Sequence, residues 1–404
     1  MRVSYAGFIY DDKEIDAVSR VLRDRKSLMG EKTKLFENKI ASLFGKKFGI
    51  MVNSGSSANL LALEILQLPE GSEIITPILT FSTTIAPIVQ KKLNPVFIDV
   101  EPGTYIINVD DIEKHITKNT KALFIPLLLG NVPDMQRLRK IADKYKLVFI
   151  EDSCDTLGAT FKGKPTGFYS DISTTSFYGS HIISGAGGGG MICVNNKEWV
   201  TDLKVLRGWG RMSSIADESE DIEKRFGYKI DNFAYDSKFI FNKIGYNFLP
   251  LEISSAFALE QLKKLKKFSN IRHKNFTYLH KFFEKYKNWF ELPKQNDKVA
   301  TNWLAFPLTI KNDAPFSRLG LVTFLEKNNV QTRPVFTGNI LKQPGFKNIN
   351  HKTSQKNYSV ADFIMERSFL IGCHHGMTKE HVNYLILLFE RFFQENLPKK
   401  NYQK

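Results

Sequence analysis

Residues 176–190 (SFYGSHIISGAGGGG) combine a potential base with an unusual run of glycine. The last six of these residues are glycine except for Ala186, and glycine permits backbone conformations and close approaches to a ligand that other residues exclude. His181 lies just before this run, and an imidazole can accept a proton at neutral pH. The segment therefore has the residues of an active-site loop. Taken alone, it leaves a glycine hinge and a structural histidine as alternatives.

Residues 53–59 (NSGSSAN) have the features of a phosphate site. They lie between an expected strand and an expected helix, so the amides near Ser56 and Ser57 would face the sheet edge at a helix N-terminus, where anions bind. A tight turn with a helix cap is the alternative.

Residues 146–152 (KLVFIED) end an expected buried strand with two adjacent carboxylates, Glu151 and Asp152. Side chains alternate along a strand, so only one of the two can face a ligand. An aspartate in that position could pair with a pyridinium nitrogen and keep it protonated, which makes a pyridine ring an electron sink. A helix cap or a salt bridge is the alternative.

The elements that would position these residues follow a βαβ pattern between about residues 47 and 195. Short apolar runs predict strands, and stretches with apolar residues at helical spacing predict helices at 57–66, 109–116 and 135–145. The strands are FGIMVN, EIITPI, PVFIDV, ALFIPLLL, KLVFIED, ISTTSFY and GGMICVNN. Right-handed crossovers between such strands place the following loops along one edge of a largely parallel sheet, where ligands bind.

The remaining chain is expected to flank this sheet. Helical patterns cover residues 12–23, 32–44 and 251–286, whereas residues 196–242 are polar and read as irregular. Residues from about 290 mix short strands (AFPLTI, VQTRPVF) with a closing helix at 378–393, which indicates a smaller α+β domain.

Composition excludes several classes of protein. With 404 residues, 42% hydrophobic and 25% charged, the chain is enzyme-sized and globular, and it has neither a spanning segment nor a secretory signal, which favours the cytoplasm. Three scattered cysteines form no disulfide framework or zinc site, and the pair His374-His375 has no carboxylate cluster that would make it a metal site. The net charge of +15 favours anionic partners such as a nucleoside diphosphate, and no nucleic-acid recognition motif accompanies it.

Five motifs in order give the sequence a resemblance that covers nearly the whole chain: NSGSSANLLAL, TPILTFSTTIAPI, FIEDSCDTLGA, TTSFYGSHIISGAGGGG and GYNFLPLEISSAFALEQL. Together they resemble the DegT/DnrJ/StrS sugar aminotransferase family of fold-type I pyridoxal phosphate (PLP) enzymes. The resemblance implies the α/β fold of PLP-dependent transferases such as aspartate aminotransferase. It also implies a large domain at 1–250 with a mostly parallel sheet, a smaller C-terminal domain at 251–404, and a homodimer with shared active sites.

The same resemblance implies roles for individual residues. Ser56, Ser57 and Ser176 match phosphate ligands, and Asp152 matches the partner of the pyridine nitrogen. Phe81 takes the place of the aromatic residue that stacks on the ring. The remaining matches are Asp155, beside the ring hydroxyl where relatives have Gln or His, and Asn247, which would reach the phosphate from the neighbouring subunit.

His181 marks a departure from the aminotransferases, because it occupies the position of the lysine that binds the cofactor covalently, and no lysine lies between Lys164 and Lys197. This substitution resembles the 3-dehydratases that remove the C3 hydroxyl of 4-keto-6-deoxy nucleotide sugars. One type carries an iron–sulfur cluster on cysteines after the WGR motif, but residues 209–220 here contain no cysteine, so a cluster is rejected. The sequence is similar to the cluster-free type that acts on GDP-4-keto-6-deoxy-D-mannose in deoxysugar synthesis for lipopolysaccharide O-antigen.

The resemblance further implies that L-glutamate converts PLP to pyridoxamine phosphate (PMP) and that His181 then removes a proton. Arg333, in the C-terminal domain, is expected to approach the sugar nucleotide, with a surface cation as the equal alternative. Two alternatives stay open. One is a dehydratase or aminotransferase acting on a CDP- or dTDP-4-keto-6-deoxy hexose, and the other is a non-catalytic binding or regulatory protein with this fold.

Overall fold

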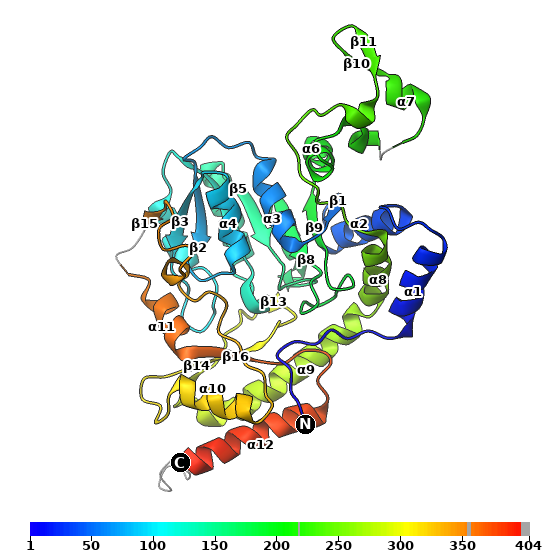
Figure 1. Ribbon diagram of the computed structural model, residues 1–404. Coiled ribbons are helices and arrows are strands. Elements are labelled where there is room, and N and C mark those ends of the chain that lie inside the picture. Colours follow the sequence, from blue (N-terminus) through cyan, green and yellow to red (C-terminus); the bar gives the residue numbers. More distant parts are fainter. Residues whose placement is uncertain (217–218, 354–356, 397–404) are drawn as a thin grey trace.

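An eight-stranded mixed sheet forms the centre of the molecule (Figure 1). The computed structural model describes residues 1–216, 219–353 and 357–396. The five strand pairs from β8 to β15 are parallel, and β9 runs antiparallel to both of its neighbours. The seven strands predicted from the apolar runs are all present. In sheet order the strands are β1 (Phe48–Val52), β9 (Gly190–Val194), β8 (Ile172–Ser176), β5 (Val148–Asp152), β4 (Thr120–Pro126), β2 (Glu73–Pro77), β3 (Asn94–Ile98) and β15 (Lys352–Thr353).

Helices cover both faces of this sheet because its strands are apolar on both sides. Ile74 and Phe124 face one way, into the core that includes helices α3 (Gly55–Glu64) and α4 (Ser82–Gln90). Their sequence neighbours Ile75 and Leu123 face the other way, into the core that includes helix α5 (Met135–Tyr145). The alternation of strand side chains therefore divides the interior into two apolar layers.

The predicted helix at 109–116 is wrong. The segment forms only two short 3-10 turns, Val109–Asp111 and Glu113–His115. Asn108 accepts a hydrogen bond from the amide of Asp110 and donates one to the Asp111 carboxylate, and such local side-chain bonds compete with a regular helix.

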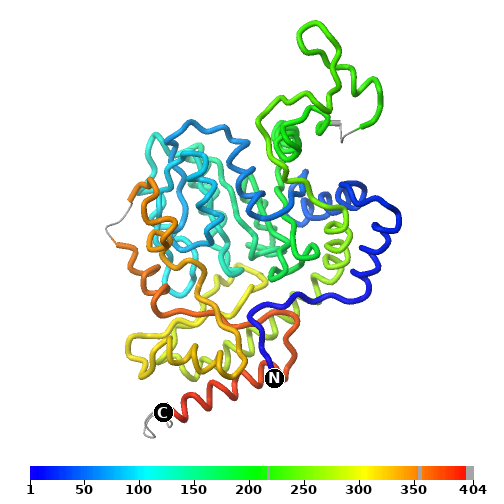
Figure 2. Tube along the Cα trace, viewed as in Figure 1, coloured from blue at the N-terminus to red at the C-terminus, as the bar shows by residue number. Residues whose placement is uncertain are grey.

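The described residues of the 196–242 stretch, 196–216 and 219–242, form more regular elements than the polar sequence indicated. Asn196 caps an eleven-residue helix, α6 (Lys197–Arg207). The chain then forms an arm, residues 208–216 and 219–245, that projects from the body (Figures 1 and 2). The arm carries α7 (Ile222–Phe226) and a hairpin of β10 (Tyr228–Ile230) and β11 (Phe233–Tyr235).

The N-terminal helices are fastened to a helix that follows much later in the chain. The predicted helices are present as α1 (Asp12–Arg23) and α2 (Glu31–Leu43), and both pack on α8 (Glu252–Lys263). The Glu252 carboxylate accepts hydrogen bonds from the amides of Gly30, Lys32 and Thr33 and from the Thr33 hydroxyl. This carboxylate therefore caps α2 from a position more than 200 residues away.

The C-terminal part adds a small sheet and further helices at the lower end of the body in Figure 1. The predicted strand VQTRPVF is wrong: only Val330 and Arg333 form isolated bridges, and Pro334 has no amide to donate to a ladder. The domain boundary at residue 250 stays a prediction. The elements of the C-terminal part are α9 (Leu265–Phe283), β12 (Phe290–Glu291), β14 (Phe306–Ile310), α10 (Arg318–Lys327), α11 (Ser359–Arg367), β16 (Ser368–Ile371) and α12 (Lys379–Asn396). A separate small sheet pairs β13 (Val299–Ala300) with two earlier strands, β6 (Thr160–Phe161) and β7 (Lys164–Pro165).

Across the described residues, no helix is both long enough and apolar enough to cross a membrane.

Candidate active site

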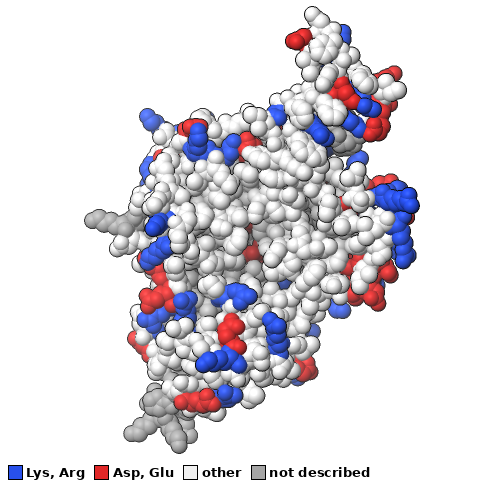
Figure 3. Space-filling model, in the orientation of Figure 1, with Lys and Arg blue, Asp and Glu red and all other residues white. Residues whose placement is uncertain are grey.

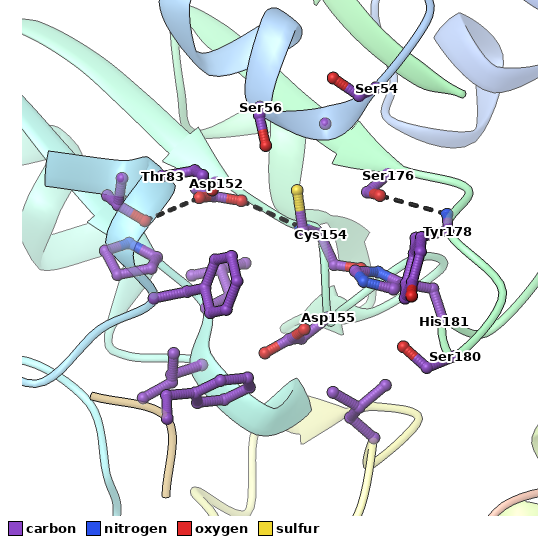
Figure 4. A pocket seen from close by; sticks show the side chains of 18 of the residues that line it. Ser54, Ser56, Thr83, Asp152, Cys154, Asp155, Ser176, Tyr178, Ser180 and His181 are labelled. Atoms are coloured by element: carbon purple, nitrogen blue, oxygen red, sulfur yellow. Dashed lines mark hydrogen bonds between the residues drawn. The ribbon is translucent and has the colours of Figure 1, made fainter. Parts of the chain in front are cut away.

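A cavity of about 450 Å³ opens at the carboxyl ends of the central strands (Figure 4). The loops after β1, β2, β4, β5 and β8 supply most of its wall, as expected for ligand sites in such sheets. The N-terminal segment and the C-terminal part complete the wall with Tyr5, Leu304, Arg333, Pro334 and Phe336.

The start of α3 forms one end of the cavity. Ser56 and Ser176 both line it, next to the positive end of the helix dipole. A Cβ atom on Gly55 would lie 2.6 Å from the Cβ of Ser176 and 2.9 Å from the Sγ of Cys154, so only glycine allows this close packing. The Ser57 hydroxyl instead donates to Asn53 at 2.7 Å, and Ser57 is not among the lining residues.

Asp152 presents its carboxylate at the end of β5, and Glu151 is fully buried. The Oδ2 atom accepts hydrogen bonds from Asn59 at 2.7 Å and from Thr84 at 3.0 Å, and Oδ1 accepts from the amide of Cys154 at 3.1 Å. These three donors fix the orientation of the carboxylate. Asn59 and Thr84 were not singled out in the sequence, although Asn59 ends the NSGSSAN segment one helical turn after Gly55.

His181 lies in the wall opposite, in the loop between β8 and β9. Its Nδ1 atom is 2.5 Å from the carbonyl oxygen of Cys154. A carbonyl can only accept, so Nδ1 carries the proton and Nε2 carries the lone pair. Burial lowers the pKa of the His181 imidazole below its ordinary value, which keeps the ring neutral and basic at Nε2.

The glycine run allows this loop to pack against the serine turn. A Cβ atom on Gly190 would lie 2.2 Å from the carbonyl oxygen of Ser54, and Gly189 has a φ of +122°. The amide of Gly189 donates to the carbonyl of Asn53. The glycines therefore allow the loop that carries His181 to contact the serine turn at the start of α3.

Asp155 follows Cys154 and is 9% exposed. Its Oδ2 atom accepts a hydrogen bond from the amide of Leu129 at 2.9 Å. Burial, together with the nearby Asp152 carboxylate, raises the pKa of Asp155 to about 7.

Aromatic and cationic side chains form the outer wall. Phe81 is half-exposed and meets the ring of Phe336 edge-on at 5.9 Å. The Arg333 guanidinium lies 5.7 Å from the ring of Tyr5. Asn247 pairs with Gly208 at the base of the arm and is not a lining residue of the cavity in its own chain.

The other polar residues considered in the sequence lie elsewhere. His374 contacts Ser4, and His375 stacks on Phe268 at 3.9 Å. Among the described residues, no group of three or more His, Cys, Asp or Glu side chains could hold a metal ion. The loop at 209–220 includes Asp217 and Glu218, which lie outside the described residues.

Comparison with known proteins identifies the family. The model of the DegT/DnrJ/EryC1/StrS aminotransferase family matches residues 9–389. This chain belongs to that family. The predicted family, and the prediction that the chain is an enzyme, are thereby confirmed.

Relatives within the DegT/DnrJ/EryC1/StrS family are similar over nearly their whole length. The lipopolysaccharide biosynthesis protein RfbH of Salmonella typhimurium is 35% identical over 402 residues, which cover 97% of this chain and 92% of RfbH. GDP-4-keto-6-deoxy-D-mannose 3-dehydratase of Escherichia coli O55:H7 is 33% identical over 387 residues, which cover 94% of this chain and 97% of that enzyme.

A crystal structure of GDP-4-keto-6-deoxymannose-3-dehydratase with a trapped PLP-glutamate geminal diamine is similar in fold, with a TM-score of 0.85. It is 31% identical, and the match covers 95% of this chain and 99% of that one. The predicted fold of PLP-dependent transferases, with a mostly parallel sheet, is therefore confirmed.

Proposed function

We propose that this protein is a PLP/PMP-dependent 3-dehydratase that removes the C3 hydroxyl of a 4-keto-6-deoxy nucleotide sugar, GDP-4-keto-6-deoxy-D-mannose being the first candidate. The observation that supports this most is His181, held in the cavity wall with Nε2 as a base where aminotransferases of this family have a lysine.

The cavity fits the cofactor. Ser56, Ser176 and the N-terminus of α3 would hold the phosphate, because that end of the cavity offers hydroxyl groups, amides and a positive helix end. Asp152 would pair with the pyridine nitrogen, and the face of Phe81 would support the ring. Ser57 would contribute through its position in the first turn of α3, since its hydroxyl is bonded to Asn53. The bound cofactor supplies an electron sink for charge that develops during the reaction.

His181 decides the type of reaction. An imidazole cannot attach the cofactor covalently, and no lysine in the described part of the chain lines the cavity. The lone pair on Nε2 can accept a proton from carbon, whereas Nδ1 keeps its proton and donates it in a hydrogen bond to the Cys154 carbonyl. The residue therefore favours elimination and disfavours capture of the product as an amino sugar.

The amino donor is proposed to be L-glutamate, as in the PLP-glutamate adduct of the similar dehydratase. Arg333, at the mouth of the cavity, offers a cation for the carboxylates of the donor or for the diphosphate of the sugar nucleotide. No iron–sulfur cluster is part of the proposal, because the three cysteines of the sequence cannot supply four ligands.

The projecting arm supports a homodimer with shared active sites. The arm exposes several large apolar side chains, and the side chain of Ile244 is 97% exposed. The centre of the face in Figure 3 also carries few charged residues. A second copy that covers the arm would remove these groups from water. Asn247, at the base of the arm, would then lie close to the partner's cavity.

Mass spectrometry tests the function directly. Incubation with GDP-4-keto-6-deoxymannose, L-glutamate and PLP is expected to remove one oxygen from the sugar without adding nitrogen. A 4-amino sugar as the product would reject the dehydratase in favour of an aminotransferase. Parallel incubations with CDP- and dTDP-4-keto-6-deoxy hexoses identify the nucleotide, and absence of cofactor binding in an absorbance titration would favour a non-catalytic protein.

A further inference from the structure

Asp155 is a buried acid in the cavity that the proposed function does not yet use. Its carboxyl group points into the cavity (Figure 4). One oxygen accepts the amide of Leu129, and within the described residues the carboxyl forms no ion pair with a lysine or arginine. The residue directly before it, Cys154, anchors His181 through its carbonyl. Cys154, which orients the base, and Asp155, which carries the acid, are therefore consecutive residues of one turn.

The surroundings of Asp155 favour its protonated form. Burial raises its pKa to about 7, and the Asp152 carboxylate on β5 adds to the effect. The other titratable or charged groups that line the same cavity are Cys154 directly before Asp155, Tyr178 and His181 from the loop after β8, Tyr5 from the N-terminal segment and Arg333 from the C-terminal part. Burial is also the main cause that raises the pKa of Tyr5. A buried carboxyl group that is kept protonated in a cavity is a usual arrangement for a general acid.

We propose that Asp155 is a second catalytic residue, the general acid that protonates the departing C3 oxygen. This inference rests on the proposed dehydration. Hydroxide is a poor leaving group, so the C3–O bond needs a proton donor as it breaks. The cavity offers His181 as a neutral base and Asp155 as a neutral acid.

The step balances without a redox partner. His181 accepts a proton at Nε2, and the electron pair of the broken C–H bond replaces the pair that leaves with the C3 oxygen. Asp155 gives its proton to that oxygen, and water departs. The enzyme is left with an imidazolium and a carboxylate, and transfer of one proton from His181 to Asp155 through solvent restores both groups.

The leaving group provides the decisive test. Asp155→Asn keeps the shape and hydrogen-bond donor of the side chain but has no acidic proton. In single turnovers of PMP-loaded enzyme, we expect the variant to lose about 10²–10⁴-fold in rate with the C3-hydroxyl substrate. With the 3-deoxy-3-fluoro analogue, fluoride needs little protonation, so the rate should stay within about tenfold of wild type.

Equal losses of rate with both substrates would overturn the role of Asp155 as an acid. Full activity of Asp155→Asn with the hydroxyl substrate would also overturn it, because an amide that only forms a hydrogen bond to the cofactor would then support the reaction as well as the carboxyl group does. If wild-type enzyme forms no dehydrated product, the proposed function itself fails.

A measurement without turnover checks the same acid. Infrared difference spectra of the cofactor-free protein are expected to show a protonated-carboxyl stretch at pH 6 that disappears by pH 9 and is absent from Asp155→Asn. Titration of that stretch near the ordinary carboxyl pKa of about 4 would overturn the proposal.

Discussion

The Nδ1 atom of His181 and the carbonyl oxygen of Cys154 lie 2.5 Å apart, and this contact fixes the tautomer of the imidazole. The proton stays on the side facing the backbone, so the nitrogen at the other side of the ring is ready to accept one. A lysine at position 181 would have no tautomers. At neutral pH it would also be protonated, and therefore without a lone pair, unless its pKa were strongly lowered.

His181→Asn removes the base but keeps an amide donor for the Cys154 carbonyl. We expect the rate of dehydration to fall by about 10²–10⁴-fold while the affinity for PLP changes little. Stopped-flow absorbance with PMP-loaded enzyme gives the rate, and equilibrium titration gives the affinity. Tyr178→Phe, which keeps the neighbouring ring, is the control. An active His181→Asn variant would remove the main support for the proposed mechanism.

The pH dependence of single-turnover rates should be bell-shaped. Activity needs neutral His181, whose pKa burial lowers from 6.5, so the rate should fall only when the pH drops below that value. Activity also needs protonated Asp155, whose pKa is raised to about 7 by burial and Asp152, so the rate should fall again above pH 7. Asp155→Asn should abolish the alkaline limb of the residual rate. Its persistence in that variant would assign the limb to another group.

Gly55→Ala should disturb the phosphate end of the cavity. The new Cβ would lie 2.6 Å from the Cβ of Ser176, and overpacking of this kind costs about 1–3 kcal/mol of the free energy of unfolding. We expect a lower urea midpoint and weaker PLP binding. Gly345→Ala is the matched control, because no atom lies within 4 Å of its added Cβ. Equal stability of the two variants would contradict the tight packing seen here.

The double substitution Phe239→Ser and Ile244→Ser should weaken the dimer. Both side chains are exposed on the arm, 58% and 97% respectively, so their change does not remove packing within the subunit core. Sedimentation velocity is expected to show a shift towards monomer and a loss of activity at low protein concentration. Leu387→Ser, on the exposed side of α12, should leave the sedimentation coefficient unchanged. A dimer unaffected by the arm substitutions would place the subunit interface elsewhere.

Protein stability should fall with acid because of His374 and His375. Burial and the Arg272 guanidinium lower the pKa of His374 to about 4 and that of His375 to about 2, whereas both groups titrate near 6.5 in the unfolded chain. The contribution of both neutral histidines is therefore complete above pH 6.5; that of His374 is lost by about pH 4, and that of His375 falls further towards pH 2. Each histidine adds a slope of about 1.4 kcal/mol per pH unit in that window. Urea titrations from pH 7 to pH 5 measure the slope, which His375→Phe should roughly halve; an unchanged slope would contradict the assignment.

The sequence predicted the framework of the site because strand periodicity and turn residues are local signals. Asp152 and Glu151 face opposite sides of the sheet as side-chain alternation requires, and the serine turn begins a helix as its residue types indicate. Helix α6 was missed because its apolar residues lie within a polar stretch, and the 109–116 helix was overpredicted because local caps replace it.

Partners brought together by the fold could not be predicted. The Cys154 carbonyl that orients His181 is a backbone atom with no sequence signature, and the Leu129 amide that fixes Asp155 comes from the 3-10 turn after β4. Long-range contacts of this kind depend on the packing of several elements, which periodicity does not reveal. The roles of Ser56, Ser57, Phe81, Asp152, Asp155, Ser176, Asn247 and Arg333 stay predictions for experiment.

The carboxylate of Glu252 has a consequence for biosynthesis of the protein. During translation, the ribosome makes α2 long before it makes the residue whose oxygens bind Gly30, Lys32 and Thr33. Those amides have no native partner until then, so the amino-terminal end of the nascent chain cannot reach its final state early. The polypeptide must close on itself late, once about two-thirds of it has been synthesised.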